Sequence, residues 1–132
     1  MKKMRARKPD NAKADREFSA KVLGRDGRVC RMERWNGVAY VEHGIKGSDD
    51  NPLQAAHIWG RPHLSPQTKY EPLVGLAACD KCHRTYDAHE KTVRVPIDRY
   101  ERADVFLRRQ QQLGKIKILP PPRIPPEHPE AA

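Results

Sequence analysis

Residues 75–83 read Gly-Leu-Ala-Ala-Cys-Asp-Lys-Cys-His, and this stretch decides how the rest of the sequence is interpreted. The apolar run over residues 73–77 predicts a strand, and residues 80–90 predict a short helix. Cys79 and Cys82 therefore lie where the strand passes into the helix. Two thiolates at this spacing form half of a tetrahedral metal site, and zinc is the usual occupant. We expect a structural Zn²⁺ ion at this pair.

A complete zinc site needs two more ligands from another part of the chain. Cys30 is the only other cysteine, so the three cysteines cannot all pair in disulfides. Glu33 follows Cys30 by three positions, the same spacing as between Cys79 and Cys82. It is our candidate for the fourth ligand, because carboxylates also bind zinc. His43 is the other candidate. The alternative is a set of three reduced thiols that bind no metal.

Composition favours a metal-stabilised domain. The 132 residues suffice for one domain. Only 37% of them are hydrophobic, whereas globular chains average about 45–50% apolar residues. A small domain with little core material often needs a structural metal. We expect a domain over residues 12–119, between a disordered basic tail (1–11) and a disordered Pro-rich tail (120–132).

The chain is strongly basic, with 26 Lys and Arg residues against 17 Asp and Glu residues and a net charge of +9. Residues 1–31 carry a surplus of +7 and residues 91–119 a surplus of +5, whereas residues 32–90 carry −2. Such segments are either solvated faces or a surface that binds a polyanion around a cation site. No run reaches the roughly 20 apolar residues of a membrane span. No apolar signal sequence follows the basic N-terminus, so we expect a cytoplasmic protein.

Hydrophobic spacing and turn residues predict the remaining elements. Phe18 and Val22, four residues apart, place one buried face on a helix. The turn at Asn36-Gly37 predicts a hairpin. The expected helices cover residues 12–23 and 98–113, the expected strands cover 29–32, 38–41, 53–58 and 115–119, and a long loop covers 60–72.

Two histidines are candidates for chemistry. His83 and Asp87 are one helical turn apart, so both point to one side and can hold a divalent cation, although many such pairs bind nothing. His57 follows two alanines near the end of the predicted strand. A histidine in that setting is either a structural residue or a general base for water, since its ordinary pKa suits proton removal near neutral pH.

Taken in order, three segments resemble the HNH endonuclease family. They are Arg25-Asp-Gly-Arg-Val-Cys30, Ala55-Ala-His-Ile58 and Gly75-Leu-Ala-Ala-Cys-Asp-Lys-Cys-His83. The resemblance covers residues 25–90. It implies an α+β fold with a small ββα-metal core, stabilised by zinc and carrying flanking helices. It also implies Mg²⁺- or Mn²⁺-dependent hydrolysis of DNA, of the kind found in bacteriophages and mobile elements in a bacterial cytoplasm.

The resemblance assigns roles by position. His57 matches the general base, and His83 matches a ligand of the catalytic cation, with Asp87 as a second ligand. The three cysteines match zinc ligands. Arg61 and Arg84 are candidates for binding the DNA phosphate and its developing charge.

The chain departs from the family pattern in three places. Val74, or Pro72 in the other possible alignment, stands where the middle Asn of the motif falls, Ala56 stands where the family usually has a cation-binding Asp or His, and Glu33 replaces the second cysteine of the first pair. These departures favour an alternative, a catalytically degenerate, zinc-stabilised module that binds nucleic acid. A third hypothesis is a basic structural protein without a site that binds RNA or a protein partner.

Overall fold

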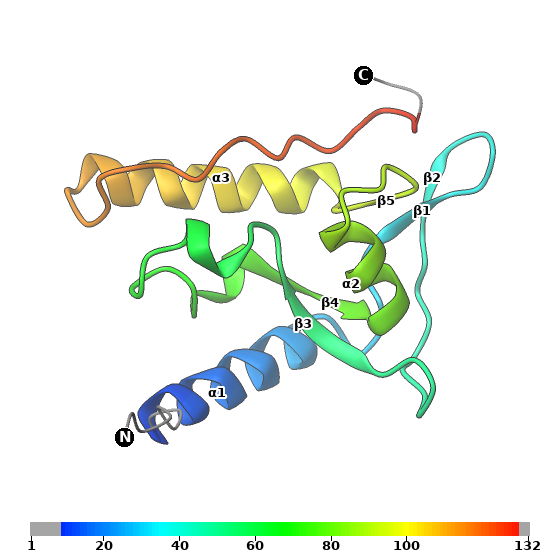
Figure 1. Ribbon diagram of the computed structural model, residues 1–132, viewed down its shortest axis with the longest axis horizontal. Helices are drawn as coiled ribbons and strands as arrows, with labels where there is room; N and C mark the ends of the chain where they lie inside the picture. The colour runs from blue at the N-terminus through cyan, green and yellow to red at the C-terminus, as the bar shows by residue number, and fades with distance from the viewer. Residues whose placement is uncertain (1–8, 130–132) are drawn as a thin grey trace, which may run out of the picture.

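The computed structural model describes residues 9–129 and has the predicted α+β class with flanking helices (Figure 1). Strands β1, β2 and β5 form one small antiparallel sheet, and β3 pairs with β4 in another. The helices lie around these sheets. The elements are α1 (Pro9–Arg25), β1 (Glu33–Trp35), β2 (Tyr40–Glu42), β3 (Leu53–His57), β4 (Gly75–Cys79), α2 (Asp80–Asp87), β5 (Val93–Arg94) and α3 (Ile97–Gln112), with two short 3-10 helices, η1 (Arg61–His63) and η2 (Pro72–Val74), between β3 and β4.

A ββα unit lies at the centre of the molecule. Strands β3 and β4 are antiparallel, with Leu53 opposite Cys79 and His57 opposite Gly75, and α2 follows β4 directly. Figure 1 shows this unit between α1 and α3. Every residue of β4 is buried, which explains why its sequence is continuously apolar rather than alternating.

Helix α1 packs one apolar side against the β3–β4 sheet, as the spacing of Phe18 and Val22 predicts. Both side chains are buried. The approach is close at Gly75, where a Cβ atom would lie 2.5 Å from the Phe18 ring. The helix begins at Pro9, so residues 9–11 belong to it and not to the expected tail, whose other residues, 1–8, lie outside the described part.

The hairpin around Asn36-Gly37 is present, but its strands are shifted from the predicted ranges. The Asn36 side chain accepts hydrogen bonds from the backbone amides of Val38 and Ala39, which closes the turn. The segments that flank β1 and β2 on the side away from the turn stay paired, since the amide of Cys30 donates to the carbonyl of Ile45 at 2.8 Å. β5 extends this sheet on the other side of β1.

The C-terminal segment differs most from expectation. Residues 115–119 form no strand, and residues 120–129 pack against the domain instead of forming a free tail (Figure 1). The Trp59 indole donates to the carbonyl of Pro121 at 2.9 Å. Arg94 donates to the carbonyl of Pro126 at 2.6 Å. An extended proline-rich backbone forms no internal hydrogen bonds, so its carbonyls are free to accept them from other elements.

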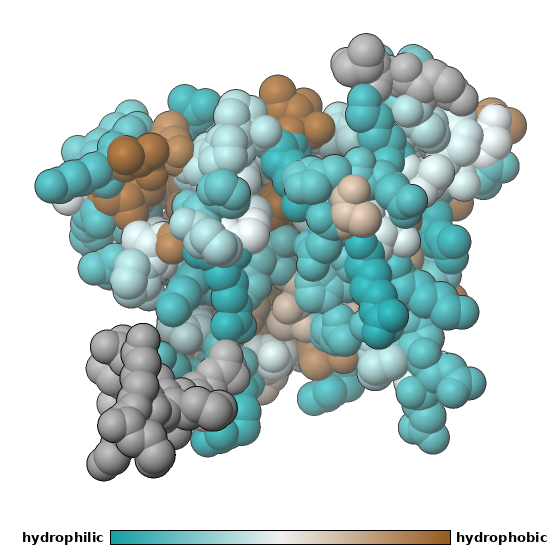
Figure 2. Space-filling model, in the orientation of Figure 1, coloured by the Kyte–Doolittle hydropathy of each residue, from teal (hydrophilic) through white to brown (hydrophobic). Residues whose placement is uncertain are grey.

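The visible surface agrees with the polar composition. Figure 2 shows a face on which hydrophilic side chains predominate and apolar ones are scattered. Among residues 9–129, no helix combines the length and the apolar character needed to cross a membrane.

Candidate functional site

Four side chains from two parts of the fold meet in one cluster. Cys30 and His43 come from the paired chains that extend the β1–β2 hairpin, and Cys79 and Cys82 come from the junction of β4 and α2. Their ligand atoms all lie within 4.8 Å of one another. The three cysteines are buried and free of disulfides, and His43 is half-buried. This cluster could hold a metal ion.

The spacing of the ligand atoms suits zinc. His43 Nδ1 lies 3.5 Å from Cys79 Sγ and 3.3 Å from Cys82 Sγ. Zn–S and Zn–N bonds of about 2.3 and 2.0 Å at tetrahedral angles place sulfur and nitrogen about 3.5 Å apart. The Cys82 amide also donates to Cys79 Sγ at 3.5 Å, as expected of two cysteines at the start of a helix. Three thiols and one imidazole form a common structural zinc site.

The fourth member of the cluster is His43, and our choice of Glu33 is wrong. The carboxylate of Glu33 pairs with Arg94 across the sheet, with Arg94 Nε donating to Glu33 Oε1 at 2.8 Å. Cys30 precedes β1, whereas Glu33 lies within the strand. These two residues therefore do not form a second metal-binding turn. The hairpin pairing brings His43 beside Cys30 instead, because the amide of Gly44 donates to the Cys30 carbonyl.

The thiols share their protons unequally. A hydrogen bond from the Cys82 thiol to the Cys30 sulfur lowers the pKa of Cys30 to about 5 and raises the pKa of Cys82. A thiolate is therefore available at neutral pH, and the thiolate is the form that binds metal. One contact must change on binding. Arg34 Nη1 lies 3.3 Å from His43 Nε2, and a guanidinium only donates, so the Arg34 side chain must move away from the Nε2–H of a His43 that binds metal through Nδ1.

His57 lies at the end of β3 with its ring held on two sides. The ring stacks on Phe18 of α1, with centroids 4.6 Å apart. Its Nε2 lies 2.7 Å from the carbonyl of Lys69, which only accepts, so Nε2 carries the proton and Nδ1 keeps a lone pair. Burial lowers the pKa of His57 and outweighs the hydrogen bond to Lys69, which raises it; the charge of Arg61, and that of His83 when protonated, lower it further. His57 is therefore neutral at pH 7 and able to accept a proton at Nδ1.

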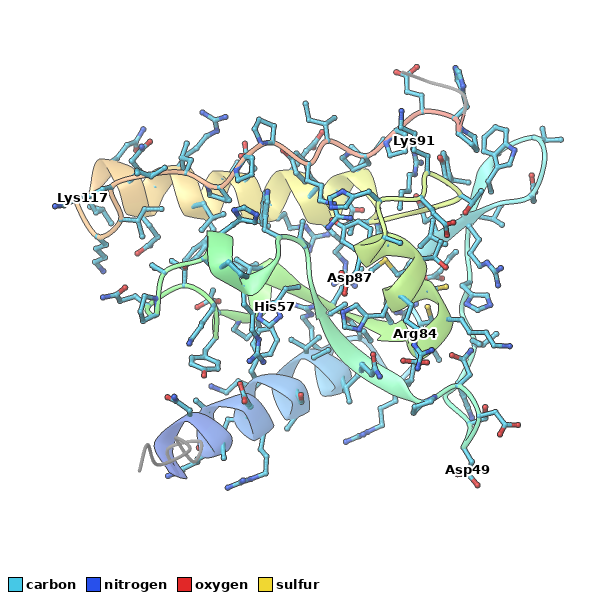
Figure 3. All side chains as sticks on the ribbon, in the orientation of Figure 1. Asp49, His57, Arg84, Asp87, Lys91 and Lys117 are labelled. Carbon is cyan, nitrogen blue, oxygen red and sulfur yellow. The ribbon has the colours of Figure 1, made fainter. Side chains whose placement is uncertain are left out.

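His83 and Asp87 form the expected pair on one side of α2. His83 Nε2 lies 3.2 Å from Asp87 Oδ2, and His83 Nδ1 lies 2.6 Å from Gln54 Oε1 of β3. Figure 3 labels Asp87 and His57 in the middle of the molecule, between α1 and α3. Among residues 9–129, no hydrogen bond or ion pair joins His57 to this pair. Their link is electrostatic, through the effect of His83 on His57.

The two candidate arginines have different surroundings. Arg61 is close enough to His57 to affect its pKa, and Arg61 Nη2 donates to Asp15 of α1 at 3.0 Å. Arg84 is largely exposed on α2, where it pairs with Asp80 at 3.0 Å. Of the two, only Arg61 acts electrostatically on His57.

The departures from the family pattern at Val74 and Ala56 lie in the core. Val74 is fully buried, and its carbonyl accepts a hydrogen bond from the amide of Ile58 at 2.8 Å. Ala56 is also fully buried, on the opposite face of β3 from His57. The apolar side chain of Val74 cannot form a hydrogen bond to orient the His57 ring. The Lys69 carbonyl orients the ring instead.

Asp26 and Gln54 carry contacts that the sequence reasoning missed. Asp26 is buried and accepts hydrogen bonds from Arg25, Arg99 and the amide of Ala77, at 2.8–3.1 Å. Burial alone would raise its pKa, but these donors outweigh burial and lower it. The carboxylate thus joins α1, β4 and α3. Asp26 looked like an ordinary turn residue before Gly27, and Gln54 had no neighbour in sequence that signalled a role.

Comparison of the chain with family models, with curated proteins and with solved structures finds no match in any of the three. The geometry of the chain itself is therefore the basis for assigning a function.

Proposed function

We propose that this protein is a metal-dependent endonuclease of the HNH type that hydrolyses DNA phosphodiester bonds. The observation that carries the proposal is the ββα unit, in which β3 ends at a neutral histidine and α2 presents His83 beside Asp87. The basic composition, with a net charge of +9, suits a polyanionic substrate.

The donors on α2 fit a Mg²⁺ or Mn²⁺ ion. An imidazole nitrogen and a carboxylate oxygen lie 3.2 Å apart, and Asp87 is exposed enough to leave room for water and phosphate. Mg²⁺ is usually held by only one or two carboxylates, with waters and substrate phosphates completing its shell. An ion held by His83 and Asp87 would polarise the phosphodiester and stabilise the leaving oxygen.

The side chains of the chain perform the proton transfer and charge neutralisation. His57 takes a proton from water at Nδ1, while its Nε2–H stays bound to the Lys69 carbonyl. Arg61, held by Asp15, acts electrostatically on His57 and would neutralise charge that develops on the phosphate. In this mechanism the Lys69 carbonyl takes over the orienting role that the family gives to the middle Asn.

We also propose that the Cys3His cluster holds a structural Zn²⁺ ion. The ion would crosslink the β1–β2 hairpin to the start of α2, the helix that carries His83 and Asp87. The zinc would therefore position the cation ligands without taking part in the reaction.

A plasmid-nicking assay with added Mg²⁺ or Mn²⁺ tests the proposed activity. We expect wild-type protein to nick DNA and His57→Ala to lose about 10²–10⁴-fold in rate, while it still binds DNA and Mn²⁺. Because the pKa of His57 is lowered, the wild-type rate should be level near neutral pH and fall only on acidification. His63→Ala, which changes an exposed histidine, is the matched control.

Nicking by His57→Ala at the wild-type rate would refute the mechanism. Wild-type protein that binds DNA and zinc but never nicks would favour the alternative, a zinc-stabilised nucleic-acid-binding module, which the buried Val74 and Ala56 also favour.

A further inference from the structure

We infer that Gln54 is a positioning residue that fixes the proton of His83 on Nδ1 and so presents the lone pair of Nε2 to a divalent cation. The inference rests on the proposed function, because it concerns the same His83–Asp87 pair. Gln54 lies on β3, on the face toward α2, and contacts two residues of that helix.

The argument begins at Asp80, whose carboxylate only accepts hydrogen bonds. Asp80 Oδ2 accepts from Arg84 Nε at 3.0 Å, and Asp80 Oδ1 lies 3.1 Å from Gln54 Nε2. The amide of Gln54 must therefore turn its NH₂ group to Asp80. This orientation leaves Gln54 Oε1 facing the imidazole of His83.

The amide orientation in turn decides which His83 nitrogen carries the proton. Gln54 Oε1 only accepts, and it lies 2.6 Å from His83 Nδ1, so Nδ1 carries the proton. Nε2 lies 3.2 Å from Asp87 Oδ2, so it donates to the carboxylate in the imidazolium and presents its lone pair toward it in the neutral imidazole, where a cation can replace the proton. Two acceptor atoms at that distance attract a positive charge between them. This is the arrangement by which a second residue orients a metal-binding histidine.

The alternative is that Gln54 only ties β3 to α2. In that case its loss would lower stability but leave cation binding and the His83 tautomer unchanged. The two roles therefore differ in measurements that do not depend on nuclease activity.

The experiment measures Mn²⁺ binding to the full zinc-loaded chain by the electron paramagnetic resonance signal of free Mn²⁺. Gln54→Met keeps the length of the side chain and removes both hydrogen bonds, and Gln112→Met, on the exposed side of α3, is the matched control. We expect about 10–100-fold weaker Mn²⁺ binding for Gln54→Met and wild-type binding for the control. Asp80→Ala should weaken binding less, and its effect should not add to that of Gln54→Met.

Wild-type Mn²⁺ affinity in Gln54→Met, with weakened binding in His83→Ala, would overturn the role of Gln54 and leave the proposed cation site standing. Wild-type affinity in His83→Ala would refute the cation site itself, and this inference with it. If Gln54→Met does not fold, the ¹⁵N spectrum of the wild-type imidazoles at about pH 8, where ordinary histidines are neutral, decides. His83 in the Nδ1–H form supports the inference, and the Nε2–H form overturns it.

Discussion

Replacing Cys82 by serine tests the zinc centre most directly. Cys82 Sγ is buried against His43 Nδ1 at 3.3 Å, and serine keeps the size of the side chain but loses the thiolate. We expect Cys82→Ser to release zinc and to unfold at a markedly lower temperature than wild type.

The magnitude follows from the chain segment that the ion would close. Cys30 and Cys79 are 49 positions apart in sequence. Treated as a crosslink, closure of a loop of this length stabilises the native state by about 4 kcal/mol. Domains of this size are stable by only about 5–15 kcal/mol. The loss should therefore lower the melting temperature by about 10–20 °C.

The assay combines zinc content by mass spectrometry with thermal unfolding followed by circular dichroism. His43→Asn should behave like Cys82→Ser, whereas Glu33→Gln should keep its zinc and lose only the ion pair with Arg94. A Cys82→Ser protein that retains one zinc ion and melts like wild type would refute the zinc centre. Zinc lost from Glu33→Gln but kept by His43→Asn would refute the assignment of the fourth ligand.

Two further predictions concern the fold around the site. Asp26→Asn should cost about 3 kcal/mol, because it leaves Arg25 and Arg99 without the carboxylate that they share. The folded-state pKa of Asp26 is lowered, so its contribution is present above the unfolded pKa near 4 and is lost as the pH falls through the folded value. Urea unfolding at several pH values should show the variant and wild type converging in acid, and a constant difference would contradict this account. Truncation after residue 119 should cost about 2–3 kcal/mol and shift Trp59 emission to longer wavelength, since the indole loses its bond to Pro121 and Tyr86 loses the stacked Arg123. Unchanged emission and melting would show that the segment does not stabilise the domain.

Local chemistry made several elements predictable from the sequence. Phe18 and Val22 at helical spacing, the apolar strand before Cys79, and the Asn36-Gly37 turn each act within a few residues, so their patterns predicted α1, β4 and the hairpin. The pairing of Cys79 with Cys82 and the alignment of His83 with Asp87 also follow from spacing along one segment.

The remaining features depend on segments that meet only in the folded chain. His43 joins the cysteines because the hairpin register brings it beside Cys30, and sequence spacing alone favoured Glu33. The packing of residues 120–129 depends on the indole of Trp59, and no local pattern predicts that partner.

For the candidate site, the amino-acid sequence specifies which groups are present: three histidines, an aspartate and three thiols. Their protonation and direction depend on contacts that form only in the folded chain. The Lys69 carbonyl holds the proton of His57 on Nε2, and Gln54, oriented by Asp80, holds that of His83 on Nδ1. The physical reason is that a side chain's tautomer and pKa are set by the donors, acceptors and charges around it, and folding brings those from distant positions in the chain.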